Sequence, residues 1–280
     1  MRTQRLVALM AVAVLLITSI SFVGAQEPVT IRWWTIYTTP QELTVLAEEL
    51  AAEYMAMYPE VTIEITHLEN EAFKERLATV MQAGDPPDIF QSWGGGVLWN
   101  YAEAGLLRDI TPDLTADDSA WKDSFSAQSA LDLYSYDGNY YGVPLTFGAV
   151  GMWYNTRLFA EAGIAEVPAT WDEFLAAVQA LKDAGITPIA LGARDKWPSH
   201  FWWVYLAIRE GGQANFEAAY NREGSFADAP FVAAGERLLE LAALEPFQTD
   251  FMAMGYGQAA GLVGNGEAAM ELMGQWEPGV

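Results

Sequence analysis

Hydrophobic and polar positions near the start of the chain follow two alternating periods. Residues 30–34 are typical of a short buried strand, and residues 41–58 place apolar side chains at helical spacing. Pro59 ends that helix, and residues 61–67 then alternate apolar and polar side chains, as a strand does. The pattern therefore predicts a strand, a helix and a second strand in succession.

The same alternation continues through the next forty residues. Residues 71–82 have the period of a second helix, which Gly84 closes, and residues 86–90 favour an extended segment. Three glycines, residues 94–96, separate that segment from a helix predicted over residues 97–104. Strands that alternate with helices predict an α/β fold with a parallel sheet, in which ligands bind at the carboxyl ends of the strands.

A second series of elements follows a predicted hairpin. Residues 134–141 hold Asp-Gly-Asn between aromatic residues, which is a strong hairpin signal, and we interpret residues 142–155 as the crossing into a second lobe. Thr170 and Glu173 form a capping box for a helix that extends to Ala184. Further elements are predicted by apolar runs: strands at 188–191 and 268–273, and helices at 201–208 and 231–244. The predicted lobes are residues 26–146 and 147–280.

The N-terminus has the layout of a secretory signal. Arg2 and Arg5 precede an apolar run over residues 6–17 and a small-residue stretch over residues 19–25. The run is too short to span a bilayer, although an uncleaved N-terminal anchor is the alternative. We expect residues 1–25 to be removed before Gln26. A lipid anchor would need a cysteine there, and the sequence has none, so we expect a soluble protein in the periplasm or outside the cell.

Charge narrows the choice of partners. The chain has 14 basic and 37 acidic residues, a formal charge of −23. Loss of the signal would leave 12 basic residues against 37 acidic ones, a charge of −25. Such a surface repels nucleic acid and anionic lipid, and it fits a neutral or cationic ligand. The alternative is that the negative charge maintains solubility and has no direct role in ligand binding.

Tryptophan is the most informative residue type for binding. Of the 11 tryptophans, Trp93, Trp197 and Trp276 fall at predicted loop positions just after strand ends. Sugars combine flat faces of C–H bonds with hydroxyl groups, so a sugar site needs exposed aromatic planes beside amides and carboxylates. The alternative for any one tryptophan is a core or rim position. We expect that role for at least one of Trp33 and Trp34, and for the helical pair Trp202 and Trp203.

Signatures of catalysis are weak by comparison. Cysteine is absent, and His67 and His200 stand alone, without a second ligand at metal spacing. No dinucleotide-binding motif, phosphate-binding loop or nucleophile elbow is present. We therefore predict no catalytic residue, no metal site and no cofactor. A secreted glycoside hydrolase stays open, because spacing alone does not show which of 37 carboxylates could form a catalytic pair.

Four segments, in order, carry a resemblance to a known family. They are QAGDPPDIFQSWGGGVLWNYAEAGLLRDIT from Gln82, YYGVPLTFGAVGMWYNTRLFAEAGI from Tyr140, PATWDEFLAAVQALKDAGITPIAL from Pro168 and GEAAMELMGQWEPG from Gly266. The set resembles bacterial extracellular solute-binding protein family 1, the sugar-type substrate-binding proteins of ABC transporters in the maltose-binding protein group. It covers most of the chain after the predicted signal.

The resemblance implies a two-lobed periplasmic-binding-protein type II fold with a ligand cleft between the lobes and a hinge that the chain crosses more than once. Such a protein binds a mono- or oligosaccharide, closes over it and delivers it to membrane permease subunits, as a monomer and without nucleic acid. Gln91, His200 and Gln275 would bond sugar hydroxyls, and Trp276 resembles the stacking aromatic. The ligand-binding residues implied by position are Thr35, Tyr37, Gln91, Ser92, Trp93, Phe147, Gly148, Trp197, His200, Gln275 and Trp276.

One feature departs from the family pattern. Family members are considerably longer, and their chains return to both lobes after the last motif, so we interpret the fold as incomplete at the C-terminus. A cationic or peptide ligand in the same fold is an alternative that the negative charge favours and the tryptophan-rich loops disfavour. A sensor partner that works without transport is another alternative, which the sequence does not separate from a transporter subunit.

Overall fold

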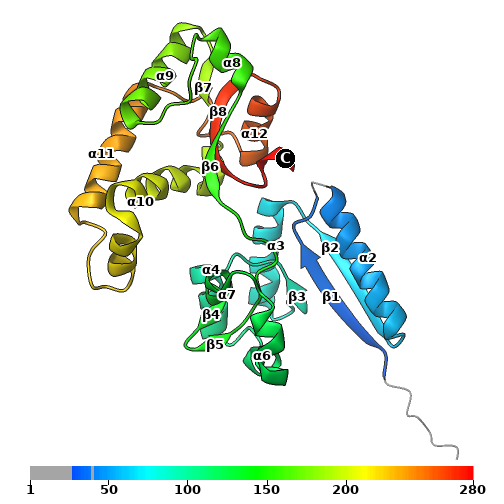
Figure 1. Ribbon diagram of the computed structural model, residues 1–280. Helices are drawn as coiled ribbons and strands as arrows, with labels where there is room; N and C mark the ends of the chain where they lie inside the picture. Colours follow the sequence, from blue (N-terminus) through cyan, green and yellow to red (C-terminus); the bar gives the residue numbers. More distant parts are fainter. Residues whose placement is uncertain (1–26, 39–40, 280) are drawn as a thin grey trace, which may run out of the picture. The chain divides into compact units, whose positions relative to one another are not determined.

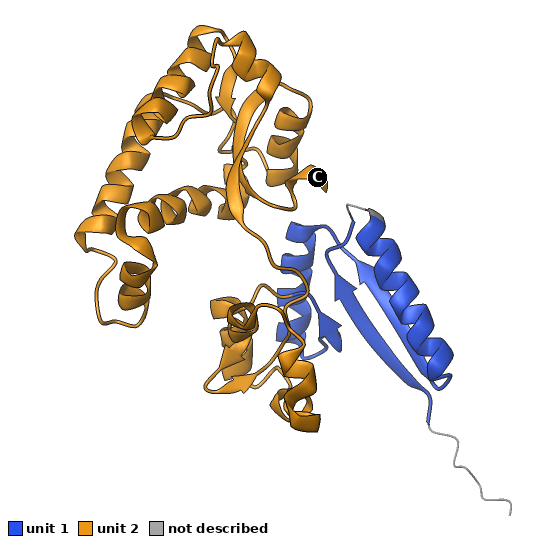
Figure 2. Ribbon diagram, in the orientation of Figure 1, with its two compact units in different colours: residues 1–91 blue, residues 92–280 orange. Residues whose placement is uncertain are grey.

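The computed structural model describes residues 27–38 and 41–279. The predicted signal, residues 1–25, and the cleavage position before Gln26 lie outside these ranges. The chain divides into two compact units, residues 1–91 and residues 92–280 (Figure 2). The predicted lobe boundary at residues 146 and 147 stays a prediction. In the part of the chain that the structure describes, no helix is long and apolar enough to cross a membrane.

Unit 1, residues 1–91, is built on a small parallel sheet. Its strands are β1 (Val29–Thr35), β2 (Val61–His67) and β3 (Ile89–Phe90), in the order β2-β1-β3 (Figure 1). Helices α2 (Gln41–Met57) and α3 (Asn70–Ala83) connect the strands. The predicted alternation of strands and helices is confirmed. A parallel sheet of this kind brings the carboxyl ends of its strands to one edge.

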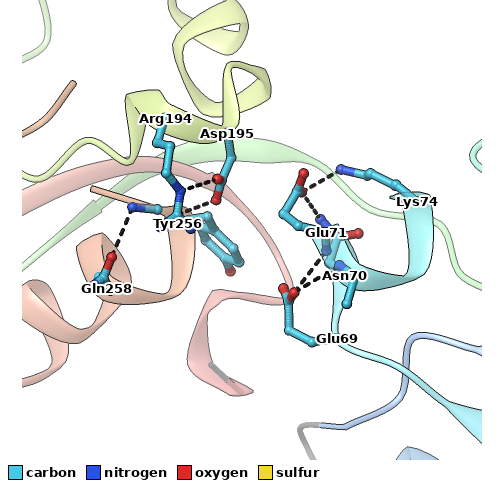
Figure 3. A network of polar contacts seen from close by, with 10 residues as sticks. Glu69, Asn70, Glu71, Lys74, Arg194, Asp195, Tyr256 and Gln258 are labelled. Carbon is cyan, nitrogen blue, oxygen red and sulfur yellow. Dashed lines mark hydrogen bonds and ion pairs between the residues drawn. The ribbon is translucent and has the colours of Figure 1, made fainter. Parts of the chain in front are cut away.

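Local chemistry fixes both ends of α3. The Glu69 carboxylate accepts hydrogen bonds from the backbone N–H groups of Glu71 at 3.0 Å and Ala72 at 3.3 Å, so it caps the helix N-terminus (Figure 3). Gly84 ends the helix with a φ of 73°, a left-handed conformation that glycine adopts without strain. Between these ends, the helix buries Phe73, Leu77 and Met81.

Helix α2 has the predicted period, but it buries only small side chains. Ala47 and Ala51 are 2% and 4% exposed, whereas Leu46, Leu50 and Tyr54 are 48%, 52% and 41% exposed. The apolar spacing that predicts the helix therefore does not translate into a buried face. Among the described residues of unit 1, the helix rests on the sheet through its alanines.

Unit 2, residues 92–280, begins with short helices and the predicted hairpin. The helices are α4 (Gly95–Glu103), α5 (Thr111–Leu114), α6 (Ala116–Asp123) and α7 (Gln128–Asp132). Strands β4 (Ser135–Tyr136) and β5 (Asn139–Tyr140) pair antiparallel across Asp137 and Gly138. Both turn residues have positive φ, 48° and 81°, as this tight turn requires. The hairpin prediction is confirmed.

A second sheet forms the centre of unit 2. Its strands are β6 (Val150–Tyr154), β8 (Ala268–Gly274) and β7 (Thr187–Ile189), in the order β6-β8-β7. Strand β8 is antiparallel to β6 and parallel to β7. All seven residues of β8 are buried. The strand predicted at residues 188–191 begins one residue earlier, at Thr187, and ends at Ile189.

Five helices and two single 3-10 turns surround this sheet. They are α8 (Thr156–Glu161), α9 (Trp171–Asp183), η1 (Ala193–Asp195), α10 (Trp197–Tyr220), α11 (Ala229–Ala243), α12 (Tyr256–Gly264) and η2 (Glu277–Gly279). The capping box of Thr170 and Glu173 is present at the start of α9, as predicted. The main core cluster joins the sheet to the helices through Leu158, Val178, Leu181, Ile189, Trp202, Leu241, Met270 and Leu272.

Candidate functional site

Aromatic rings from three separate segments of unit 2 gather beyond the carboxyl end of β8. The Trp197 ring lies 4.8 Å from the Tyr256 ring and 6.4 Å from the Trp276 ring, measured between ring centroids. Phe201 lies 5.5 Å from Trp197 and 6.4 Å from Trp276. We call these four residues the aromatic cluster. Two of its members, Trp197 and Trp276, are predicted ligand-binding residues.

Helix starts position two of these rings. Trp197 is the first residue of α10 and is followed by Pro198, which is favoured in the first turn of a helix. The prediction of a loop position for Trp197 is therefore wrong, because the helix begins four residues before the predicted position 201. Tyr256 begins α12, and its backbone N–H donates to Asp195 Oδ2 at 2.8 Å (Figure 3). That bond ties the start of α12 to the segment just before α10.

Close packing explains the glycine next to Trp276. A Cβ atom at Gly274 would collide with the Trp276 ring, so the ring folds back over the end of β8 only because residue 274 is glycine. The Trp153 indole N–H donates to the carbonyl oxygens of Met273 and Gly274 at 3.2 and 3.1 Å and fixes that strand end. The Trp276 side chain remains 40% exposed. It is an aromatic surface that a ligand can reach.

Gly148, in the segment predicted to cross into the second lobe, lies beside the same strand end. A Cβ atom at Gly148 would collide with the Gln275 side chain, so these two predicted residues are in contact. Phe147 is 73% exposed. His200 lies three residues after Trp197 on α10, and its exposed ring is 6.4 Å from Phe201. The structure thus brings Gly148, Gln275 and Trp276 together and places His200 on the helix that carries Trp197.

Ser92 and Trp93 are positioned by the hairpin of unit 2. The Tyr134 hydroxyl donates to the carbonyl oxygen of Ser92 at 3.3 Å. Gly94 has a φ of 70° and sits so close to Leu133 that a Cβ would collide with its backbone. The chain therefore turns sharply directly after Trp93, whose side chain is 42% exposed. Ligand contact by Ser92 and Trp93 stays a prediction.

The three predicted residues of unit 1 lie at the carboxyl edge of its sheet. Thr35 ends β1, and its side chain is 1% exposed, with Oγ1 2.6 Å from His67 Nδ1. The backbone N–H of Tyr37 donates to that same hydroxyl at 3.3 Å. The backbone N–H of Gln91 donates to the carbonyl oxygen of Trp34 at 3.1 Å. In this structure the Thr35 hydroxyl therefore makes hydrogen bonds that stabilise the loop after β1.

Tyr256 of the aromatic cluster and the neighbouring Glu271 and Glu277 are not among the predicted site residues. The Tyr256 hydroxyl donates to Glu277 Oε2 at 3.0 Å, and burial, followed by the nearby Glu277 charge, raises the pKa of Tyr256. Glu271 is 2% exposed, and its pKa is raised to about 10, by burial first and by Glu277 second. A charged residue inside an apolar strand was the sequence signal for Glu271. Tyr256 had no clear signal, because its helix is glycine-rich.

Among the described residues, no group of three or more His, Cys, Asp or Glu side chains could hold a metal ion. The arrangement instead offers an exposed indole plane, an amide and carboxyl groups. These groups can stack on an apolar face and hydrogen-bond to polar substituents.

The sequence matches the family model described as bacterial extracellular solute-binding protein over residues 39–280. The chain belongs to this family. Solved sugar-binding proteins share the α/β fold of this chain, so the predicted family and fold class are confirmed. The expectation of a core residue in each tryptophan pair is also confirmed, since Trp34 is 8% and Trp202 is 4% exposed, while Trp33 and Trp203 are half-buried.

Individual members of the solute-binding family are similar over most of this chain. An uncharacterized ABC transporter extracellular-binding protein of Pyrococcus horikoshii is 29% identical, with 91% of this chain and 56% of the relative covered. A probable sugar-binding periplasmic protein of Mesorhizobium japonicum is 28% identical, with 89% and 58% covered. A solved structure of a chitin oligosaccharide binding protein matches with a TM-score of 0.78 and 30% identity, covering 89% of this chain and 62% of that one. The chain thus spans somewhat over half the length of these relatives.

Proposed function

We propose that this solute-binding family member is the extracytoplasmic substrate-binding component of an ABC transporter and that it captures a mono- or oligosaccharide. The observation that carries the proposal is the exposed Trp276 ring beside Trp197, Phe201 and Gln275. An indole plane provides apolar contact for the C–H face of a sugar ring, and neighbouring polar side chains can bond its hydroxyls. Relatives whose names specify sugars or chitin oligosaccharides support this ligand class.

The proposed partners follow from the same relatives. One is named as a binding protein of an ABC transporter, which supports delivery of the ligand to membrane permease subunits. The family is extracellular, and a secretory signal at the N-terminus would export the chain to the periplasm or the medium. Capture by closure of two lobes, and a monomeric state, belong to the proposal as well.

We propose that the protein binds its ligand without breaking a bond in it. Members of the family bind solutes, which supports a role without catalysis. The carboxyl pair nearest the aromatic cluster also suits binding better than hydrolysis, because Glu271 is 2% exposed and could not reach a glycosidic oxygen on the surface of Trp276.

Calorimetric titration and thermal shift with a panel of neutral mono- and oligosaccharides test the proposal. A ligand that binds only the folded protein raises its melting temperature, so at least one sugar should do so. Trp276→Ala should weaken that sugar's affinity by about 10–100-fold, because a large aromatic contact is lost. Trp121→Ala is the matched control, since Trp121 in α6 is 45% exposed, close to the 40% of Trp276.

Other outcomes would point elsewhere. Binding of polyamines or peptides but of no sugar would keep the fold and replace the ligand class. Cleavage of an oligosaccharide would contradict the proposal and support a glycoside hydrolase. Equal losses in Trp276→Ala and Trp121→Ala would show that the effect is not local to the aromatic cluster.

A further inference from the structure

Glu271 occupies an unusual position for a carboxyl group. It lies in the middle of β8, where it pairs with Trp153 of β6, and every other residue of that strand is buried with it. Its side chain is 2% exposed, and no N–H or O–H donor group hydrogen-bonds to either carboxyl oxygen. Burying an ionised carboxylate without a partner is strongly unfavourable. The group must therefore carry a proton or share one with a neighbour.

The charged groups around Glu271 offer a proton-sharing partner and no cation. Glu277 of η2 and Tyr256 of α12 are the titratable groups that act on it, and Tyr256 donates its hydroxyl to Glu277 Oε2 at 3.0 Å. On the neighbouring η1, Arg194 is paired with Asp195 at 3.0 Å, and His200 of α10 is exposed. Within the described ranges, no ion pair includes Glu271 or Glu277. Two close carboxyl groups without a counterion cannot both be ionised at low cost.

Glu277 differs from Glu271 in its access to the surface. It directly follows Trp276 and is half-buried, whereas Glu271 is enclosed. The Tyr256 hydroxyl occupies Oε2 of Glu277 and so fixes the direction of the carboxylate. A carboxylate accepts several hydrogen bonds, so further lone pairs of Glu277 remain available beside the Trp276 ring.

We propose that Glu271 is a protonated positioning residue that shares its proton with Glu277, and that Glu277 accepts a hydrogen bond from a hydroxyl of the sugar stacked on Trp276. The proposal rests on the proposed function for its ligand, but not for the protonation of Glu271. In this arrangement Tyr256 and Glu271 hold Glu277 from the protein side. The pair of carboxyl groups then carries one negative charge rather than two.

The pH dependence of stability without ligand tests the shared proton. Glu271 is protonated in the folded protein and ionises near its ordinary pKa when unfolded, so the melting temperature of the wild type should fall as pH rises above about 4.5. Glu271→Gln is neutral at every pH. Its melting temperature should exceed that of the wild type by a margin that grows between about pH 4.5 and pH 9. Glu267→Gln, an exposed position just before β8, should shift little.

A constant margin between Glu271→Gln and wild type across this range would overturn protonation. So would a loss of stability in Glu271→Gln that does not depend on pH. Isotope-edited infrared spectroscopy gives a second reading, because a protonated carboxyl group at pH 7 should be present in the wild type and absent in Glu271→Gln.

Titration with the sugar found in the panel tests the role of Glu277. Glu277→Gln should weaken binding by about 10-fold or more, since a hydrogen bond to a charged acceptor is lost. Glu267→Gln, at an exposed position outside the site, should leave the affinity unchanged. An unchanged affinity in Glu277→Gln would overturn the contact. Binding of amino sugars alone would instead assign Glu277 to a cationic ligand. If no sugar binds, the proposed function fails, while the pH profile still decides the protonation of Glu271.

Discussion

The two sheets of this protein contrast in how completely they are enclosed. In unit 2 every residue of the central strand β8 is buried, and helices from several parts of the chain pack around it. In unit 1 the central strand β1 buries only Trp34 and Thr35, and the neighbouring helix α2 leaves Leu46 and Leu50 exposed. Both sheets have strand ends that carry predicted ligand-binding residues. The contrast shows that segments with similar apolar patterns in the sequence can bury very different numbers of side chains.

The enclosure of β8 has a consequence for the candidate site. Trp276, Gln275 and Glu277 directly follow a strand whose every residue is buried, so the strand gives them a fixed base. Sites that rest on rigid elements hold their geometry better than sites on loops alone. In unit 1, the Thr35 hydroxyl is used within the unit itself, through His67 and Tyr37. Unit 2 is therefore where changes near the strand end should affect both stability and binding.

The largest expected effect comes from the core beneath the site. Leu272→Ala removes a side chain that is 2% exposed in the main core cluster, and it should lower the free energy of unfolding by about 2–5 kcal/mol. Urea denaturation followed by tryptophan fluorescence measures this loss. Leu50→Ala in α2 is the matched control, because the same atoms are removed from a side chain that is 52% exposed. Equal losses in the two variants would contradict the contrast between the sheets.

A smaller effect is expected where β8 meets the turn that carries Trp276. Gly274→Ala places a Cβ where the Trp276 ring lies, so the ring must move. Sugar affinity should fall by about 10-fold or more, and stability by about 1–3 kcal/mol. Gly151→Ala is a suitable control on the neighbouring strand β6, since a Cβ there meets no atom within contact distance. Unchanged affinity in Gly274→Ala would show that the position of the ring does not determine binding.

The sequence patterns predicted the positions of helices and strands better than they predicted which side chains are buried. The hairpin around Gly138 and the capping box at Thr170 were predictable, because each depends on a few adjacent residues. The apolar period of α2 predicted a helix, but Leu46 and Leu50 are exposed, because burial depends on what lies opposite. Helix α12 was missed because glycine is a poor helix former, and tertiary contacts such as that of Asp195 support its first turn.

The candidate site shows the same limit. Its aromatic members Trp197 and Trp276 could be selected from composition and position, and Gln275 from its place beside Trp276. Glu271 could be noticed as a charged residue inside an apolar strand, but its pairing with Glu277 could not be predicted, because that depends on the burial of Glu271. Proton sharing depends on the distance between the two carboxyl groups and on the absence of a nearby cation among the described residues. The sequence shows neither.

Helix caps provide a test in which the two units should behave alike. The Thr170 hydroxyl accepts from the backbone N–H of Glu173 at 3.3 Å in unit 2, and Glu69 caps α3 in unit 1. Thr170→Ala should cost about 1 kcal/mol, and Thr170→Ser, which keeps the acceptor, much less. Thermal unfolding of the two variants measures the difference. A loss as large as that of Leu272→Ala would mean that the cap does more than complete the first turn of α9.

The smallest effect should come from the exposed leucines of unit 1. Leu50 is 52% exposed, and Gln has nearly the same helix propensity, so Leu50→Gln should change the free energy of unfolding by no more than about 0.5 kcal/mol. Ala47→Gln, on the same helix, places a polar side chain at a position that is 2% exposed and should destabilise by about 1–3 kcal/mol. Denaturant titration of both variants resolves this difference. If Leu50→Gln destabilised the chain as strongly as Ala47→Gln, the leucine face of α2 would be covered in solution, and the two sheets would be more alike than their exposed fractions indicate.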